Sequence, residues 1–410
     1  MRKTSLWGLL VQIHLCGLVL TSYTFLLSCG NSQNEVPLRE HAVLDSIHVT
    51  TGFPIMTRHS GVIRDPESGD EILYFGDPVT ANALRFFDIA GDTLFTVQLD
   101  SVTPRVGAVN GISVHTLDSI LISGPHNNRL AWIDRSGKVL SAWDVSKALI
   151  TNKGDIFWMY PSNLRSCVFD TFALFAIEWR ENQHWELPDY RVNYLDYVTI
   201  FRTNTQAQPH FVRFGLNPDV RYDPEYGVPA FYNRFCKGPS RTSLALCYTL
   251  IGGHILLTSE HSDTLYVIDP VSLDIERTVP LHSRVSAVHI PPPLYTPEEA
   301  ANKTNMVEKR WLTGGAVQNI SYDAASNQYL VVAYHQVPLE TGEDRNGANR
   351  SFSVLAFDTV FGPTAEYVFD DIKYDGRELL STSKGVYMRR HEDRRTQAGG
   401  VHVFDRIEFK

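Results

Sequence analysis

The chain contains 410 residues, with a formal net charge of -9 and a sequence isoelectric point near 5.9. This acidic balance provides no electrostatic footprint for nucleic acid, so we expect no nucleic-acid partner. Residues 41–410 exceed the usual size of one or two compact domains, yet no charged, Ser/Gly-rich or Pro-rich linker divides them. One large repetitive domain is therefore favoured.

The first 28 residues have the pattern of a signal peptide. A basic start, Met1–Lys3, precedes a long apolar run, which ends at Ser28 and is followed by Cys29. A small residue directly before a cysteine resembles the lipobox of bacterial lipoproteins, in which the cysteine becomes the lipidated N-terminus. We therefore predict a signal peptide over residues 1–28, lipidation of Cys29, and a polar lipidated tether over residues 29–40.

Two other interpretations of this segment remain open. Trp7–Leu27 approaches the roughly 20 apolar residues that a membrane span needs, although Gln12 and His14 interrupt it. The segment also fits a secretory signal that is cleaved without lipidation. All three interpretations export the chain.

The residue after the cysteine bears on the location. Gly30 is not the aspartate that retains lipoproteins at the inner membrane. We therefore expect a lipoprotein of the cell envelope, held at the outer membrane by its acyl chains and facing the periplasm or the cell surface.

The body of the chain holds three cysteines, Cys167, Cys236 and Cys247. An odd number cannot pair completely. Cys236 and Cys247 either form a disulfide in an oxidising compartment or are two small buried hydrophobic residues.

A short β-rich run that ends in aspartate recurs along the body. Two separations, from Asp88 to Asp134 and from Asp358 to Asp405, are 46 and 47 residues. This is the length of one four-stranded propeller blade, and the longer separations are typical of blades with insertions. A sixth run, Asp196–Arg202, lacks the final aspartate. The five complete runs are Leu84–Asp88, Leu130–Asp134, Leu265–Asp269, Val354–Asp358 and Val401–Asp405.

Each run has the same neighbours. Another β-rich segment precedes it, such as Glu71–Phe75, and a turn such as Arg135–Lys138 leads from it to a further strand. The turn chemistry and the β-branched and aromatic content are those of hairpins. Six such units predict an all-β fold, a six-bladed β-propeller of four-stranded blades, in which ring closure protects the sheet edges. Two stacked β-sandwich domains fit the number of strands but not the sixfold recurrence.

The two ends of the chain predict how such a ring closes. The last unit stops at Lys410, directly after its third strand, while Ala42–Val49 has the alternation of a strand. We therefore predict that the N-terminal strand completes the last blade. Insertions are expected at about 178–196, 214–243, 291–311 and 338–350, and the third contains a short helical pattern, Thr296–Lys309.

These features together resemble a known group of proteins. The lipobox, the short tether, the strands ending in aromatic-Ile-Asp and the chain length are similar to those of uncharacterised six-bladed β-propeller lipoproteins of Gram-negative bacteria, which carry a domain of unknown function. The resemblance implies a fold and a location. It implies no catalytic residues.

The sequence contains no motif of a familiar enzyme class. A Gly-x-Ser-x-Gly elbow, a P-loop, a dinucleotide fingerprint and His-Glu-x-x-His are all absent. The alternative to a binding protein is a metal-assisted hydrolase or lyase with a Ca²⁺ or transition-metal ion on the propeller axis. Its weak candidate ligands are His126, Glu260, His261 and His335, and the competing interpretation is that these are unrelated polar loop residues.

The insertion of the third unit is the better functional indication. Aromatic and arginine side chains dominate interaction hot spots, and aromatic rings stack on sugars. The alternative is that both tryptophans of this insertion cover their own blade. A second polar segment, Arg389–Arg395, is predicted to be a charged loop in solvent rather than a ligand clamp. The candidate binding residues are Trp179, Arg180, Trp185, Tyr190 and Arg191.

The sequence therefore favours a membrane-anchored lipoprotein whose propeller face binds a ligand, a glycan or a protein partner. A metal-assisted hydrolase or lyase is the alternative. A scaffold subunit of an envelope complex shares every feature of the first function.

Overall fold

The structure is a computed structural model, in which the chain divides into residues 1–37 and a compact unit of residues 38–410. Among the described residues, no helix is long and apolar enough to cross a membrane. The described residues are 36–55, 59–77, 81–107, 109, 111–124, 129–144, 156–159, 167–168, 172–180, 209–215, 226–227, 246–259, 263–272, 274–286, 315–336, 351–369, 373–391 and 400–409.

Five sheets of the compact unit each contain four antiparallel strands, which are consecutive in the chain in four of the sheets, whereas the fifth combines three consecutive strands with one from the N-terminus. They are β3 (Ser60–Arg64), β4 (Glu71–Asp77), β5 (Ala83–Asp88) and β6 (Thr93–Gln98); β7 (Gly111–Thr116), β8 (Ser119–Gly124), β9 (Arg129–Ile133) and β10 (Val139–Asp144); β16 (Leu246–Ile251), β17 (His254–Ser259), β18 (Thr264–Ile268) and β19 (Ile275–Pro280); β20 (Ala316–Asp323), β21 (Gln328–Tyr334), β22 (Phe352–Phe357) and β23 (Pro363–Phe369); and β24 (Tyr374–Thr382), β25 (Gly385–Arg390), β26 (Val401–Phe409) and β2 (His41–Thr50).

A further sheet is less complete within the described residues. Its long strands β13 (Phe172–Arg180) and β14 (Pro209–Gly215) are flanked by short pieces, β11 (Ile156–Met159), β12 (Cys167–Val168) and β15 (Tyr226–Gly227). Both β11 and β12 pair with β13. A short helix, α2 (Thr103–Val106), follows β6, whereas the helix predicted over Thr296–Lys309 lies outside the described residues.

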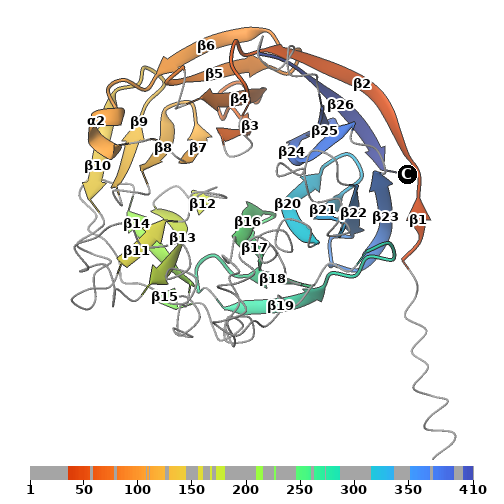
Figure 1. Cartoon of the computed structure of the whole chain (residues 1–410). Coiled ribbons are helices and arrows are strands. Elements are labelled where there is room, and N and C mark those ends of the chain that lie inside the picture. Colours follow the sequence, from red (N-terminus) through yellow and green to blue (C-terminus); the bar gives the residue numbers. More distant parts are fainter. Residues whose placement is uncertain are drawn as a thin grey trace, which may run out of the picture. The chain divides into compact units, whose positions relative to one another are not determined.

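The sheets are arranged as the blades of a β-propeller. In Figure 1 the first strands of the sheets, β3, β7, β16, β20 and β24, lie nearest the centre. Neighbouring first strands contact one another in the order β7, β3, β24, β20 and β16. The predicted all-β propeller with four-stranded blades is confirmed.

Alternation along the strands explains why adjacent sheets adhere. Successive side chains of a strand point to opposite faces, so Phe86 of β5 packs toward the sheet β7–β10 while Phe87 packs toward the sheet of β24–β26. Leu330 and Val331 of β21 divide in the same way between two other interfaces. Because both faces of a middle strand are buried, these strands read as continuous apolar runs.

The recurring aspartate has a structural role in four blades. Asp88 Oδ1 accepts hydrogen bonds from the backbone N–H groups of Ala90 and Asp92, both at 2.9 Å. The same pattern recurs at the end of the third strand in other blades, at Asp134, Asp269 and Asp358. The carboxylate thus holds the turn to the fourth strand in shape, as short polar side chains commonly do.

The N-terminal strand pairs with the C-terminal strand. Partners run from His41 opposite Phe409 to Thr50 opposite Val401, with an irregularity between Val43 and Ser46. Just before it, β1 (Leu38–Arg39) pairs in parallel with β23 of the neighbouring sheet. Figure 1 shows β2 running along the outside of β26.

Candidate ligand-binding site

A cavity of about 550 Å³ lies at the C-terminal ends of five first strands, and we call it the central cavity. Each of these strands is the last member of its sheet on the inner side. An edge strand offers backbone N–H and C=O groups along its outer side. The lining residues on the strands are Ser60–Val62 and Arg64 of β3, Ser113–His115 of β7, Thr249–Ile251 of β16, Ile320–Tyr322 of β20, and Leu379, Ser381 and Thr382 of β24, joined by Glu71 and Tyr74 of β4.

Hydroxyl groups dominate the polar part of this lining. Seven serine and threonine side chains and two tyrosines contribute to it, and aliphatic side chains fill the positions between them. Each hydroxyl can both donate and accept a hydrogen bond. The lining hydroxyl residues are Ser60, Tyr74, Ser113, Thr249, Ser321, Tyr322, Ser381, Thr382 and Ser383.

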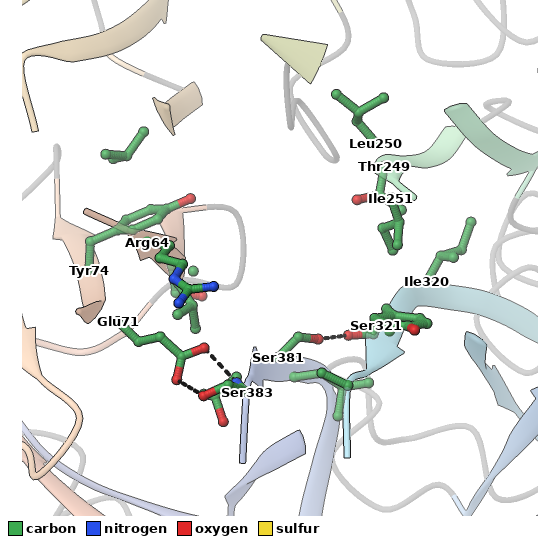
Figure 2. Close-up of a pocket in the computed structure, with 18 of the residues that line it drawn as sticks. Arg64, Glu71, Tyr74, Thr249, Leu250, Ile251, Ile320, Ser321, Ser381 and Ser383 are labelled. Carbon is green, nitrogen blue, oxygen red and sulfur yellow. Dashed lines mark hydrogen bonds between the residues drawn. The ribbon is translucent and has the colours of Figure 1, made fainter. Parts of the chain in front are cut away.

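Hydrogen bonds between blades hold the lining in place around β24. Ser381 bonds Ser321 of β20, and Ser383 Oγ donates to Glu71 Oε2 of β4 at 2.8 Å (Figure 2). The backbone N–H of Ser383 donates to the other oxygen of Glu71. The inner strand of the last blade and the turn that follows it are therefore hydrogen-bonded to blades on both sides.

A buried charged group lies beside the cavity. Ser60, which lines the cavity, donates to Glu378 Oε2 at 2.7 Å, and Glu378 is 1% exposed. Arg389 Nη1 lies 3.8 Å from Glu378 Oε1 and also donates to the carbonyl of Ile55 at 3.3 Å. A buried carboxylate is tolerated only with such partners. Glu378 thus connects the wall of the cavity with the guanidinium of Arg389.

A bulge in β24 brings these charges together. The pairing of β24 with β25 shifts between Asp375 and Leu379, which are opposite Arg389 and Met388. Bulges of this kind redirect side chains next to functional sites. Here the bulged residues are Gly376, Arg377 and Glu378, in a strand that otherwise pairs with β25 residue by residue.

Asp375 and Arg377 of β24 form an ion pair, which changes the pKa of the aspartate. Burial alone would raise the pKa of Asp375, but the guanidinium of Arg377, with Nε 2.9 Å from Oδ1, lowers this pKa to about 2. Burial raises the pKa of Tyr334, whose hydroxyl donates to Asp375 at 3.2 Å. Asp375 therefore remains a carboxylate at every physiological pH.

A second set of contacts fastens the connection between β2 and β3, residues 51–55, to the last blade. Thr51 N–H donates to the carbonyl of Gly400 at 2.7 Å, and His402 Nε2 lies 3.0 Å from the carbonyl of Phe53. Burial lowers the pKa of His402 to about 4, so this imidazole is neutral at pH 7. Gly400 has φ of 66°, and a Cβ there would lie 2.3 Å from Phe53 N, so only glycine fits.

The structure locates only part of the predicted binding loop. Trp179 and Arg180 are the last two residues of β13 and are opposite Phe157 and Ile156 of β11. They lie where the first strand of that sheet begins, whereas the central cavity lies where first strands end. Trp179 and Arg180 therefore lie at the opposite strand end from the one that lines the cavity. Trp185, Tyr190, Arg191 and the lipidation site Cys29 lie outside the described residues.

Of the four candidate metal ligands, His335 is the one that belongs to the described residues. His335 is buried, and its Nε2 lies 2.8 Å from Ser353 Oγ. Ser353 in turn donates to Glu366, which is fully buried and also accepts from Ser283. No group of three or more His, Cys, Asp or Glu side chains in the described residues could hold a metal ion. His126, Glu260 and His261 lie outside these residues.

One sequence interpretation is revised by the structure, and one of the recurring aspartates differs from the other four. Arg389 was expected in a solvent-exposed charged loop. This expectation is wrong, because the side chain of Arg389 is buried and lies against Glu378. Asp405, the fifth recurring aspartate, holds no turn; instead it is buried and accepts from Ser46, Tyr374 and Arg390.

The residues of the cavity carry little signal in the sequence. Ser321, Ser381 and Ser383 are ordinary strand and turn residues, and their role depends on blades that are far apart in the chain. One signal was available at Asp375–Glu378, where three charged residues and a glycine stand together within a strand. Such an interruption is typical of a bulge.

Comparison with known proteins supports the fold. No protein-family model and no curated protein matches the chain. A solved structure of a DUF4221 family member from Bacteroides vulgatus is similar, with 18% identity, a TM-score of 0.63, and coverage of 92% of this chain and 99% of that chain. At this identity the likeness supports the β-propeller fold of this chain and nothing further.

Two other solved structures are more distant. A luciferin-regenerating enzyme and a streptogramin B lyase each show 10% identity and a TM-score of 0.41 over 89% of this chain, covering 96% and 98% of their own chains. These scores are too low to support an inference about this chain.

Proposed function

We propose that this protein is a ligand-binding lipoprotein of the cell envelope, in which the central cavity takes a small molecule rich in hydrogen-bonding groups. The observation that carries the proposal is the lining itself. Hydroxyl side chains from five first strands converge at the strand ends around a volume of about 550 Å³. This volume lies within the range of roughly 300–1,000 Å³ that is typical of small-molecule sites.

Such a lining suits a polar ligand because many of its groups can both donate and accept hydrogen bonds. The edge strands add backbone N–H and C=O groups, whose positions are fixed by the sheets. Several hydroxyls are held by partners in the next blade, as Ser321 is by Ser381. A site that is already ordered loses less conformational freedom when a ligand binds.

A screen followed by a blocking variant tests the proposal. The full chain would be screened against monosaccharides, disaccharides and small polar metabolites by thermal shift, and the hits titrated against Thr249→Trp and Thr278→Trp. Thr249 lines the cavity, whereas Thr278 is exposed on the outer strand β19. We expect Thr249→Trp to abolish binding and Thr278→Trp to retain it. Equal affinity in both variants would place the ligand elsewhere and contradict the proposal.

The ring itself is part of the proposal. We take the incomplete sheet of β11–β15 as the sixth blade, since it follows β10 and precedes β16 in the chain. The pairing of β2 with β26 supports closure of this ring by the N-terminal strand. The lipobox supports anchoring at Cys29 in the outer membrane.

We also retain the aromatic loop as a contact surface for a protein or glycan partner. Trp179, Arg180, Trp185, Tyr190 and Arg191 supply the stacking and charged groups that such surfaces use. Because Trp179 lies at the strand end opposite to the cavity, this surface and the cavity would act separately.

A further inference from the structure

We infer that the ligand of the central cavity is a polyhydroxylated carboxylate, such as an acidic sugar, whose carboxylate binds Arg64. This inference rests on the proposed function of the cavity. It adds the charge and the chemical class of the ligand, which hydroxyl groups alone leave undetermined.

An arginine and a glutamate line the cavity side by side. Arg64, at the end of β3, and Glu71, at the start of β4, are directly opposite each other in the pairing of the two strands. Among the lining residues they are the one arginine and the one glutamate, and the lining holds no lysine or aspartate. The ligand therefore meets one fixed cation and one fixed anion.

The two charged side chains differ in how many of their polar atoms already have a hydrogen-bond partner. Both carboxylate oxygens of Glu71 accept hydrogen bonds from Ser383, one from the backbone N–H and one from the hydroxyl. Glu71 thus forms hydrogen bonds that join the first blade to the last. Figure 2 shows its carboxylate turned toward Ser383.

The guanidinium of Arg64 uses one of its N–H groups in a hydrogen bond to the described part of the chain. Its Nε donates to the carbonyl of Gly69 at 3.0 Å, which fixes the direction of the side chain. Among the described residues, its two terminal amino groups have no further hydrogen bond, and Figure 2 shows the guanidinium directed into the cavity. A guanidinium of this kind matches a carboxylate, which it binds with two parallel hydrogen bonds.

The remaining lining suits the rest of such a ligand. Ser113, Thr249 and Ser321 can exchange hydrogen bonds with ligand hydroxyls in either direction. Tyr74 and the aliphatic Val62 and Leu250 provide apolar surface beside them, as the C–H faces of a sugar require.

Titration of matched ligands tests the inference. The full chain, purified in detergent, would be titrated calorimetrically at constant ionic strength with D-glucuronate, D-glucose and acetate, and with D-galacturonate and D-galactose. We expect at least one uronate to bind roughly tenfold or more tightly than its neutral sugar and than acetate, as a charge-assisted bidentate contact allows.

Variants of Arg64 give the decisive comparison. Arg64→Gln should remove the preference for the uronate while leaving the weak affinity for the neutral sugar, and Arg64→Lys should retain part of it. Arg105→Gln, an equal loss of charge on the exposed surface of α2, is the control and should change nothing. Because Arg64 is exposed, its replacement should not impair folding.

The outcomes separate this inference from the function on which it rests. Equal binding of uronate and neutral sugar, no binding of either uronate, or an unchanged preference in Arg64→Gln would overturn the carboxylate assignment. Any of these results would leave the cavity function standing if another ligand is lost in Thr249→Trp. Uronate binding that persists in Thr249→Trp would overturn both.

Discussion

At the scale of single residues, the aspartates that end the third strands show how one repeated side chain can be used in two ways. In four blades the carboxylate accepts backbone N–H groups of the following turn. In the last blade no such turn follows, and Asp405 instead receives hydrogen bonds from Ser46 of the N-terminal strand and from Arg390. The sequence repeat identified the position of these residues correctly but could not distinguish the two roles.

The turn contacts predict a modest stability effect. Asp358→Ala removes hydrogen bonds of 2.9 and 2.7 Å to Val360 and Gly362, and should lower the free energy of unfolding by about 1 kcal/mol. Asp358→Asn keeps an acceptor and should lose less. Urea denaturation of the three proteins measures this, and an equal loss in both variants would show that the acceptor is not what matters.

His402 predicts how stability depends on pH. Its pKa is about 4 in the folded chain and its ordinary value is 6.5, so the unfolded chain binds the proton more tightly. The contribution of His402 to the free energy of unfolding is complete above pH 6.5. As the pH falls toward 4 this contribution is lost, which lowers the free energy of unfolding by about 3 kcal/mol in total.

Comparison with a variant isolates this contribution. His402→Gln can still donate to the carbonyl of Phe53 but does not titrate, so its unfolding free energy should vary less between pH 6.5 and 4 than that of the original chain. Parallel pH profiles for the two proteins would mean that His402 is not the group that titrates.

At the scale of elements, β24 is the strand on which the site depends. Its bulge places Glu378 against Ser60 of β3, and its end places Ser381 against Ser321 of β20. The first strand of the last blade is thus joined to its neighbours on both sides by side-chain hydrogen bonds, in addition to the apolar packing between sheets.

Removal of Glu378 should be costly. Glu378→Ala leaves Arg389 buried without its carboxylate, so we expect the free energy of unfolding to fall by about 3 kcal/mol or more. Glu67→Ala, at an exposed turn position, is the control and should be nearly neutral. Chemical denaturation distinguishes them, and a loss below about 1 kcal/mol for Glu378→Ala would argue against the ion pair.

Strands and turns could be predicted from local sequence because their signals are local. The run Leu84–Asp88 and the pairing of Ala42–Val49 with the last strand are both present. The central cavity could not be predicted, because Ser60 and Glu378 are separated by 318 positions. Arg389 was misplaced for the same reason, since its neutralising partner lies in another strand.

At the scale of the whole molecule, the N-terminus connects the predicted anchor to the strand that pairs with the C-terminus. If Cys29 carries acyl chains, Cys29→Ala should move the protein from the membrane fraction to the soluble fraction of cells. The propeller should remain folded, because residues 38–410 form a compact unit of their own. Cell fractionation measures the distribution. Continued sedimentation with membranes would favour an uncleaved anchor instead.

Ligand binding in the central cavity is the property on which the proposed function depends most. A crystal structure of the full chain with a ligand identified by the thermal-shift screen measures this directly. We predict electron density for the ligand between the ends of β3, β7, β16, β20 and β24, with contacts to their serine and threonine hydroxyls. A ligand bound at the loop after β13, with water alone in the cavity, would contradict the account.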